Sequence, residues 1–108
     1  MDIELLYFDG CPSWQSALEN LKIALVEENM SAQIHLIKID SPEQANKQRF
    51  LGSPSIRIES TDLWPEQRED YFMGCRVYPT PEGLRGYPTI EMIREKLIVY
   101  KSPETEKE

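Results

Sequence analysis

The spacing between apolar positions changes several times along the chain, and each change marks the start of a new predicted element. Residues 3–8 form a short apolar run that ends at Asp9 and Gly10, which is typical of a central strand buried on both faces. Pro12 suits the first position of a following helix, which we expect to reach about Glu28. The apolar face of this helix consists of Trp14, Ala17, Leu18, Leu21 and Leu25.

The next segments repeat the strand and helix pattern. Residues 33–39 predict a second strand, and its parallel pairing with the first requires the right-handed crossover that the intervening helix provides. Ser41 can cap another helix with Pro42 at its first position, and this short helix should end near Gly52. Residues 53–58 then read as a third strand that begins on a proline.

The remaining pattern is a charged loop followed by one strand and one helix. Residues 59–70 form the loop, and residues 71–78 predict a fourth strand in a hairpin with the third. Residues 79–86 hold two prolines and two glycines, which predicts a connecting loop before a last helix that starts near Pro88 or Thr89. The apolar face of that helix consists of Ile90, Ile93, Leu97 and Tyr100.

The order strand, helix, strand, helix, strand, strand, helix predicts an α/β fold with a central four-stranded mixed sheet flanked by helices. A chain of 108 residues can build one core, so we expect a single domain over residues 1–101. Residues 102–108 are polar and predict a frayed C-terminal tail.

The charge balance and the apolar runs exclude two classes of partner. Twelve basic and nineteen acidic residues give a net charge of −7, which argues against binding to nucleic acid. No apolar run is long enough to cross a membrane, and the acidic start of the chain lacks the pattern of a secretory signal. We therefore expect a cytoplasmic protein.

Cys11 is the first candidate for chemistry, because it lies where the first strand turns into the first helix. Unpaired N–H groups and the positive end of the helix dipole stabilise a thiolate there, which predicts a reactive nucleophile. The alternative is a small buried residue beneath the helix start. Trp14 stands three residues later, where a dithiol redox protein has its second cysteine, so a resolving partner must come from elsewhere.

Cys75 is the other cysteine, and three roles are open to it. It can resolve a disulfide with Cys11, act as the second thiolate for a soft metal, or pack on the fourth strand where it alternates with Met73 and Val77. Two cysteines lack the spacing of a structural zinc site, and the chain has no glycine-rich dinucleotide motif. We therefore predict no resident metal and no cofactor.

Three aromatic or imidazole side chains have simpler explanations than catalysis. Trp14 is expected in the core or at its rim, and the lone His35 is expected as an exposed residue of an edge strand. Trp64 and Leu63 in the acidic loop can form a flap over the Cys11 site or a partner-binding patch, or they can simply anchor the surface.

These features resemble the thioredoxin fold over about residues 2–100. Residues 11–14 (Cys-Pro-Ser-Trp) stand at the place of that family's Cys-X-X-Cys site, and Ser53-Pro54 stands at the place of its cis-proline. The resemblance implies that the strand order is 2-1-3-4, that Pro54 follows a cis peptide bond, and that it lies beside Cys11. The residues it implies for substrate binding are Pro12, Ser13, Trp14, Ser53 and Pro54. In that sheet the third strand separates the first from the fourth, so whether Cys75 reaches Cys11 stays open.

A closer resemblance is to a little-characterised group of small prokaryotic thioredoxin-like proteins. Four segments carry it, namely residues 5–14, 50–58, 75–78 and 83–89. Some members have selenocysteine at the position of Cys11, which implies redox or metalloid chemistry there.

The same pattern is similar to the core of alkylmercury lyase. In that enzyme two cysteines grip and cleave a carbon–mercury bond, and here Cys11 and Cys75 are 64 residues apart (75 minus 11). The enzyme also uses an acidic residue shortly after its first cysteine. This chain has Ser13 and Trp14 there, and Asp9 lies two positions before Cys11.

The leading hypothesis is a thioredoxin-like thiol redox protein in which Cys11 is the nucleophile and Cys75 is the candidate resolving cysteine. Its partners would be a thiol or disulfide substrate and a reductant such as glutathione or another thioredoxin system. The first alternative is a soft-metal or organomercurial site made by both cysteines. The second is a non-catalytic interaction module that kept the fold and lost the dithiol.

Overall fold

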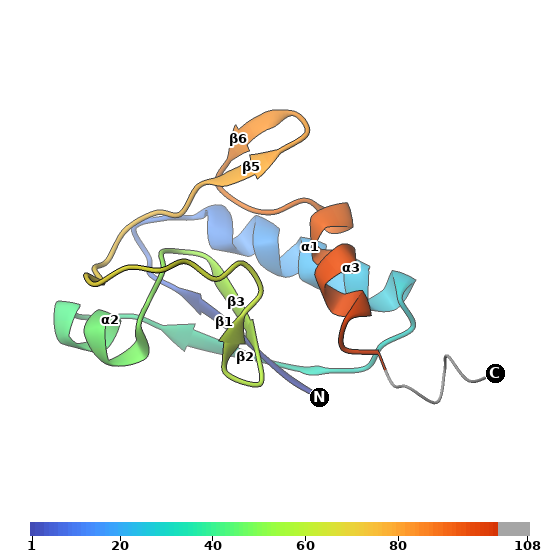
Figure 1. The fold of residues 1–108 in the computed structure, drawn as a ribbon, viewed down its shortest axis with the longest axis horizontal. Coiled ribbons are helices and arrows are strands. Elements are labelled where there is room, and N and C mark those ends of the chain that lie inside the picture. Colours follow the sequence, from blue (N-terminus) through green and yellow to red (C-terminus); the bar gives the residue numbers. More distant parts are fainter. Residues whose placement is uncertain (102–108) are drawn as a thin grey trace.

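The computed structural model describes residues 1–101, and these form a mixed α/β fold (Figure 1). One four-stranded sheet has the order β2-β1-β3-β4, and a separate hairpin pairs β5 with β6. The strands are β1 (Asp2–Tyr7), β2 (Gln33–Lys38), β3 (Ser55–Ile58), β4 (Thr61–Asp62), β5 (Tyr78–Thr80) and β6 (Gly83–Arg85). The helices are α1 (Ser13–Glu27), α2 (Pro42–Gln48) and α3 (Ile90–Ile98).

Strand β1 is central in the sheet and pairs along both edges. It runs parallel to β2 and antiparallel to β3, so that Ile3 lies opposite Ile34 on one side and Ile58 on the other. The predicted parallel pair of the first two strands is therefore confirmed. Helix α1 supplies the crossover that parallel strands need.

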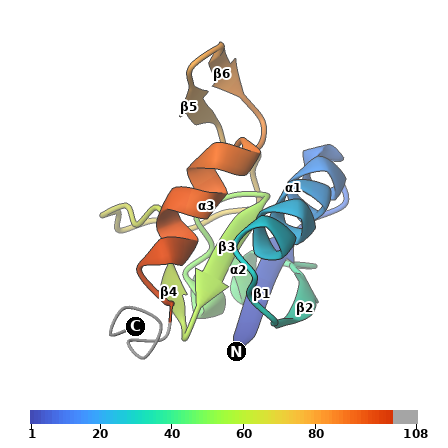
Figure 2. The same ribbon diagram turned by 90° about the vertical axis from the view of Figure 1, so that its right-hand side faces the viewer.

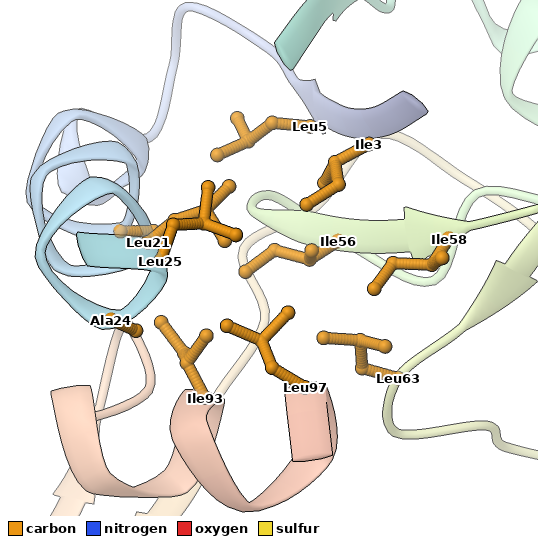
Figure 3. Packing of buried hydrophobic residues seen from close by; sticks show 11 residues of the cluster. Ile3, Leu5, Leu21, Ala24, Leu25, Ile56, Ile58, Leu63, Ile93 and Leu97 are labelled. Atoms are coloured by element: carbon orange, nitrogen blue, oxygen red, sulfur yellow. The ribbon is translucent and has the colours of Figure 1, made fainter. Parts of the chain in front are cut away.

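Helices α1 and α3 cover one face of the sheet and enclose the main core (Figure 2). Figure 3 shows Leu21 and Leu25 of α1 and Ile93 and Leu97 of α3 beside the side chains of β1 and β3. The buried members of this core are Ile3, Leu5, Ala17, Leu21, Ala24, Leu25, Ile56, Ile58, Leu63, Ile93 and Leu97. A smaller cluster under α2 consists of Leu6, Ile39, Ala45 and Phe50. Because neighbouring residues of β1 alternate between these clusters, both faces of the sheet are covered.

Two of the predicted helix starts are confirmed by their caps. The hydroxyl of Ser41 accepts a hydrogen bond from the Gln44 N–H at 3.1 Å, and the hydroxyl of Thr89 accepts one from the Met92 N–H at 3.1 Å. The predicted end of the second helix near Gly52 is wrong. Arg49 takes a left-handed conformation (φ 53°), which ends α2 at its preceding residue.

The predicted fourth strand over residues 71–78 is wrong. The fourth strand of the sheet is β4, which follows β3 directly after a turn at Glu59 and Ser60, both with positive φ. This tight turn lets β4 pair with β3 directly, so the free edge of β3 is already occupied before the chain reaches residue 71. Of residues 71–78, only Tyr78 belongs to a strand, and that strand is β5.

The predicted connecting loop over residues 79–86 is replaced in part by the β5–β6 hairpin. This hairpin stands away from the sheet (Figure 1). Gly83 has a φ of 107°, and the Thr80 hydroxyl donates a hydrogen bond to its carbonyl at 2.6 Å. Glycine takes this backbone conformation readily, which allows the chain to turn back from β5 into β6.

No helix within residues 1–101 is both long and apolar enough to cross a membrane. The tail predicted over residues 102–108 lies outside the described residues.

A buried carboxylate joins the end of α1 to α3. Glu28 is 6% exposed, and its oxygens lie 2.8 Å from Arg94 Nε and 2.8 Å from Lys101 Nζ. Hydrogen bonds from Lys101 and Arg94 hold the pKa of Glu28 below its ordinary value of 4.5. The carboxylate form therefore stabilises the packing of α1 against α3.

Stability is predicted to fall in acid through Glu28. A lowered pKa in the folded state contributes stability that is present above the ordinary pKa and lost as the pH falls through the folded-state value. Glu28→Gln should therefore be less stable than wild type at neutral pH, and it should lose less stability as the pH falls below the ordinary carboxyl pKa of 4.5. Urea unfolding of the two proteins checks this, with the exposed Glu19→Gln on the same helix as control. Parallel pH curves for wild type and Glu28→Gln would contradict it.

Candidate functional site

Cys11 lies in the short connection between β1 and α1. Its N–H donates a hydrogen bond to the Phe8 carbonyl at 3.2 Å, which turns the chain after the strand. Pro12 is the N-cap residue and the helix begins at Ser13, one residue later than predicted. Cys11 is 3% exposed. It therefore lies at the helix start and is also buried, two features that the sequence analysis treated as alternatives.

Cys75 is joined to Cys11 by a disulfide bond. The two Cα atoms are 5.8 Å apart, a usual separation for a disulfide. The fold thus brings the two cysteines together across 64 residues. Packing of Cys75 on a fourth strand is wrong, because Cys75 is exposed and the chain forms no strand there. It also does not lie beyond β3, since it forms an isolated bridge with Ser53, two residues before β3.

Ser53 holds the segments of both cysteines. Its N–H donates to the Gly74 carbonyl at 2.8 Å, and its carbonyl accepts from the Arg76 N–H at 2.9 Å. Its hydroxyl accepts from the Phe8 N–H at 3.2 Å. Backbone bonds on both sides of Cys75, together with a side-chain bond close to Cys11, therefore fix the two chain segments against each other.

Pro54 follows a cis peptide bond, as predicted. It is fully buried, and its carbonyl accepts a hydrogen bond from the Tyr78 hydroxyl at 2.6 Å. Burial raises the pKa of the Tyr78 phenol, which therefore stays a neutral donor. Ser53 and Pro54, expected beside a substrate, are thus covered by the chain's own residues 74–78.

The other three predicted substrate residues lie at the start of α1. Pro12 is exposed and Ser13 is half-buried. Ser13 lies against Gly86, where an added Cβ would meet its Oγ at 2.6 Å, so a side chain at residue 86 would have to displace the Ser13 hydroxyl. Trp14 stacks on Tyr7 with ring centroids 4.2 Å apart and packs against the main core, which confirms its predicted place in the core or at its rim.

Arg76 is a buried arginine at the site that the sequence analysis did not single out. It is 5% exposed, its guanidinium lies 3.0 Å from the Asp62 carboxylate, and it donates to the Ser55 hydroxyl at 3.2 Å. It also donates to the Trp64 carbonyl and lies over the Tyr78 ring, 5.0 Å from its centroid. This network fixes the residue next to Cys75. The one sequence signal for Arg76 was strand-like alternation, which directs the side chains of residues 75 and 76 to opposite faces.

Gly52 permits the close approach of Arg76. It has a φ of 117°, and an added Cβ would lie 2.9 Å from the Arg76 Cβ and 3.2 Å from its Cα. A side chain at this position would therefore push residues 75–76 away from the sheet. From the sequence, Gly52 was expected only near the end of the second helix.

The remaining candidates lie away from the cysteines or have structural contacts. His35 is exposed as predicted, with its Nε2 3.1 Å from the Asp2 carboxylate. Asp9 is exposed and forms an ion pair with Lys38 at 2.8 Å. Trp64 packs edge to face against Tyr78, with ring centroids 5.2 Å apart. Among residues 1–101, no three His, Cys, Asp or Glu side chains gather so that they could hold a metal ion.

Comparisons of the chain with protein-family models, with curated proteins and with solved structures found no match. The function must therefore be argued from the cysteine pair and the residues that position it.

Arg76→Met is predicted to destabilise the protein by about 3 kcal/mol, because it leaves the buried Asp62 carboxylate without its partner. Urea unfolding of the reduced protein measures this without a contribution from the disulfide. Arg85→Met is the matched control, since Arg85 is exposed on β6 and its loss should change stability by less than about 0.5 kcal/mol. Equal effects of the two substitutions would show that the Arg76 network does not hold the segment.

Proposed function

We propose that this protein is a thioredoxin-like thiol redox protein in which Cys11 and Cys75 form the exchanging pair. The observation that carries the proposal is the direct bond between an exposed cysteine and a cysteine at the start of α1. A pair in this position can alternate between a disulfide and two thiols while the rest of the fold stays in place. Trp14 no longer argues against redox chemistry, because the second thiol comes from residue 75.

The arrangement of the fold supports the thioredoxin-like part of the proposal. The sheet order β2-β1-β3-β4 matches the order implied by the resemblance, with β1 and β2 parallel and β3 antiparallel. A cis peptide bond precedes Pro54 just before β3. The first cysteine lies at the turn from β1 into α1.

The surroundings of Cys11 favour an ionised thiol. The start of α1 presents backbone N–H groups and the positive end of the helix dipole to the preceding residues. Both stabilise a thiolate, which is the form that attacks and leaves in disulfide exchange. Electrons would come from glutathione or from another dithiol protein. In a reducing cytoplasm the bond would then form and break during turnover.

The cysteine pair is predicted to interconvert reversibly with glutathione. Incubation at several ratios of glutathione to glutathione disulfide should give a two-electron transition between disulfide and dithiol. Alkylation of free thiols followed by mass spectrometry measures it. The disulfide form should also be more stable by about 2–4 kcal/mol, a difference absent from Cys11→Ser and Cys75→Ser. If the pair does not exchange at any ratio, a non-catalytic interaction module becomes the better account.

The same proximity favours one second candidate, a two-thiolate site for a soft metal ion. When the bond is reduced, two sulfurs lie side by side, and thiolates prefer soft ions such as Hg²⁺. Cleavage of a carbon–mercury bond is a weaker proposal than binding. The lyase has an acidic residue shortly after its first cysteine, whereas this chain has Ser13 and Trp14 there. Asp9, which precedes Cys11, is paired with Lys38.

The soft-metal candidate predicts that the reduced protein binds one Hg²⁺ ion and that each single-cysteine variant binds it at least about tenfold more weakly. Calorimetric titration in competition with a small dithiol measures the affinities. His35→Ala is the control, because His35 is exposed and bonded to Asp2 and its loss should change nothing. Equal affinity in wild type and Cys75→Ser would exclude a shared site.

A further inference from the structure

The two bonded cysteines differ in their access to solvent. Cys11 is 3% exposed beneath the start of α1, whereas Cys75 is exposed. The neighbours of Cys75 share its exposure, since Phe72 is 58% exposed and Val77 is 56% exposed. A molecule that approaches the disulfide from solvent therefore meets residue 75 first.

The other approach to the disulfide is blocked by the chain itself. Both backbone groups of Ser53 are bonded to Gly74 and Arg76, and the carbonyl of the buried Pro54 is bonded to Tyr78. An incoming peptide cannot pair with Ser53 or rest on Pro54 while these bonds are present. Because Ser53 and Pro54 are covered in this way, substrate is left with the exposed side of residue 75.

Exchange chemistry favours the same sulfur. An attacking thiolate selects the accessible sulfur of a disulfide, and the bond breaks faster when the departing thiolate is the more stable one. Attack on Cys75 expels Cys11 at the start of α1, where the helix stabilises negative charge. Attack on Cys11 would require access to a buried residue. It would also expel the Cys75 thiolate, which has no helix start beside it in the chain to stabilise its charge.

We propose that Cys75 is the cysteine that bonds to substrate and that Cys11 is the one that resolves the bond, an assignment that rests on the proposed function. A substrate thiolate attacks the Cys75 sulfur, the Cys75–Cys11 bond breaks, and Cys11 leaves as a thiolate with the electron pair. A second substrate thiolate then attacks the substrate sulfur of the mixed disulfide and Cys75 leaves as a thiolate, so two substrate thiols become one disulfide and the cysteine pair gains two electrons. In the opposite direction Cys75 attacks a substrate disulfide and Cys11 displaces the substrate from Cys75.

The order of roles thus differs from the one expected from sequence, where Cys11 was the attacking residue. The substrate class it predicts is a thiol or disulfide that reaches Cys75 on an exposed segment, which also carries the exposed apolar residues Phe72 and Val77. It does not require a substrate strand to pair with Ser53.

The test is to trap the mixed disulfide in the wild-type protein. The oxidised protein is mixed with glutathione, quenched with an alkylating reagent at early times, digested and mapped by mass spectrometry. We expect glutathione on Cys75 in excess over Cys11 on the order of tenfold. Glutathione mainly on Cys11 would overturn the assignment alone. If neither cysteine carries glutathione and the pair stays oxidised, the proposed function fails and the assignment fails with it.

A second measurement separates access from chemistry. The reduced Cys11→Ser and Cys75→Ser variants are treated with a bulky maleimide, after circular dichroism has shown that both are folded. Cys75 in Cys11→Ser should be modified faster than Cys11 in Cys75→Ser by about tenfold or more. Equal rates, or faster modification of Cys11, would contradict the access on which the assignment depends.

Discussion

The candidate site depends on one constraint, the pairing of residues 74–76 with Ser53 at the start of β3. Two backbone hydrogen bonds hold this segment on either side of Cys75, and the Ser53 hydroxyl ties the same point to the end of β1. Because Cys11 follows β1 by a few residues, a single residue fixes both cysteines. The disulfide is thus a consequence of how the backbone is held.

Burial of Arg76 explains how an irregular segment keeps its place. Phe72, Cys75 and Val77 of this segment are exposed, so burial of these three side chains does not hold it in place. Arg76 of the same segment bonds its guanidinium to Asp62, Ser55 and Trp64, and this network of hydrogen bonds and one ion pair fixes the segment against the sheet. A buried charge of this kind is favourable only while each partner remains in place, which makes the arrangement specific.

The sequence predicted the parts of the fold that local pattern controls. The strands β1 and β2, the caps Ser41 and Thr89 and the cis bond at Pro54 are found where periodicity, capping chemistry or resemblance placed them. The fourth strand was misplaced because the alternation of residues 71–78 resembles a strand. In the fold the alternation leaves Cys75 exposed and Arg76 buried. The segment is nevertheless no strand of the sheet, because Cys75 forms only an isolated bridge with Ser53.

The sequence by itself determined the order of elements from β1 to β3, the position of Cys11 at a helix start and the lack of a resolving cysteine at Trp14. These features follow from the spacing of side chains over a few neighbouring residues, and that spacing is present in the sequence itself. Only the tertiary structure decided that Cys75 meets Cys11, that Ser53 and Pro54 are covered, and that Cys75 is the exposed one of the two cysteines. Those outcomes depend on hydrogen bonds and packing between segments far apart in the chain, and no local pattern records them.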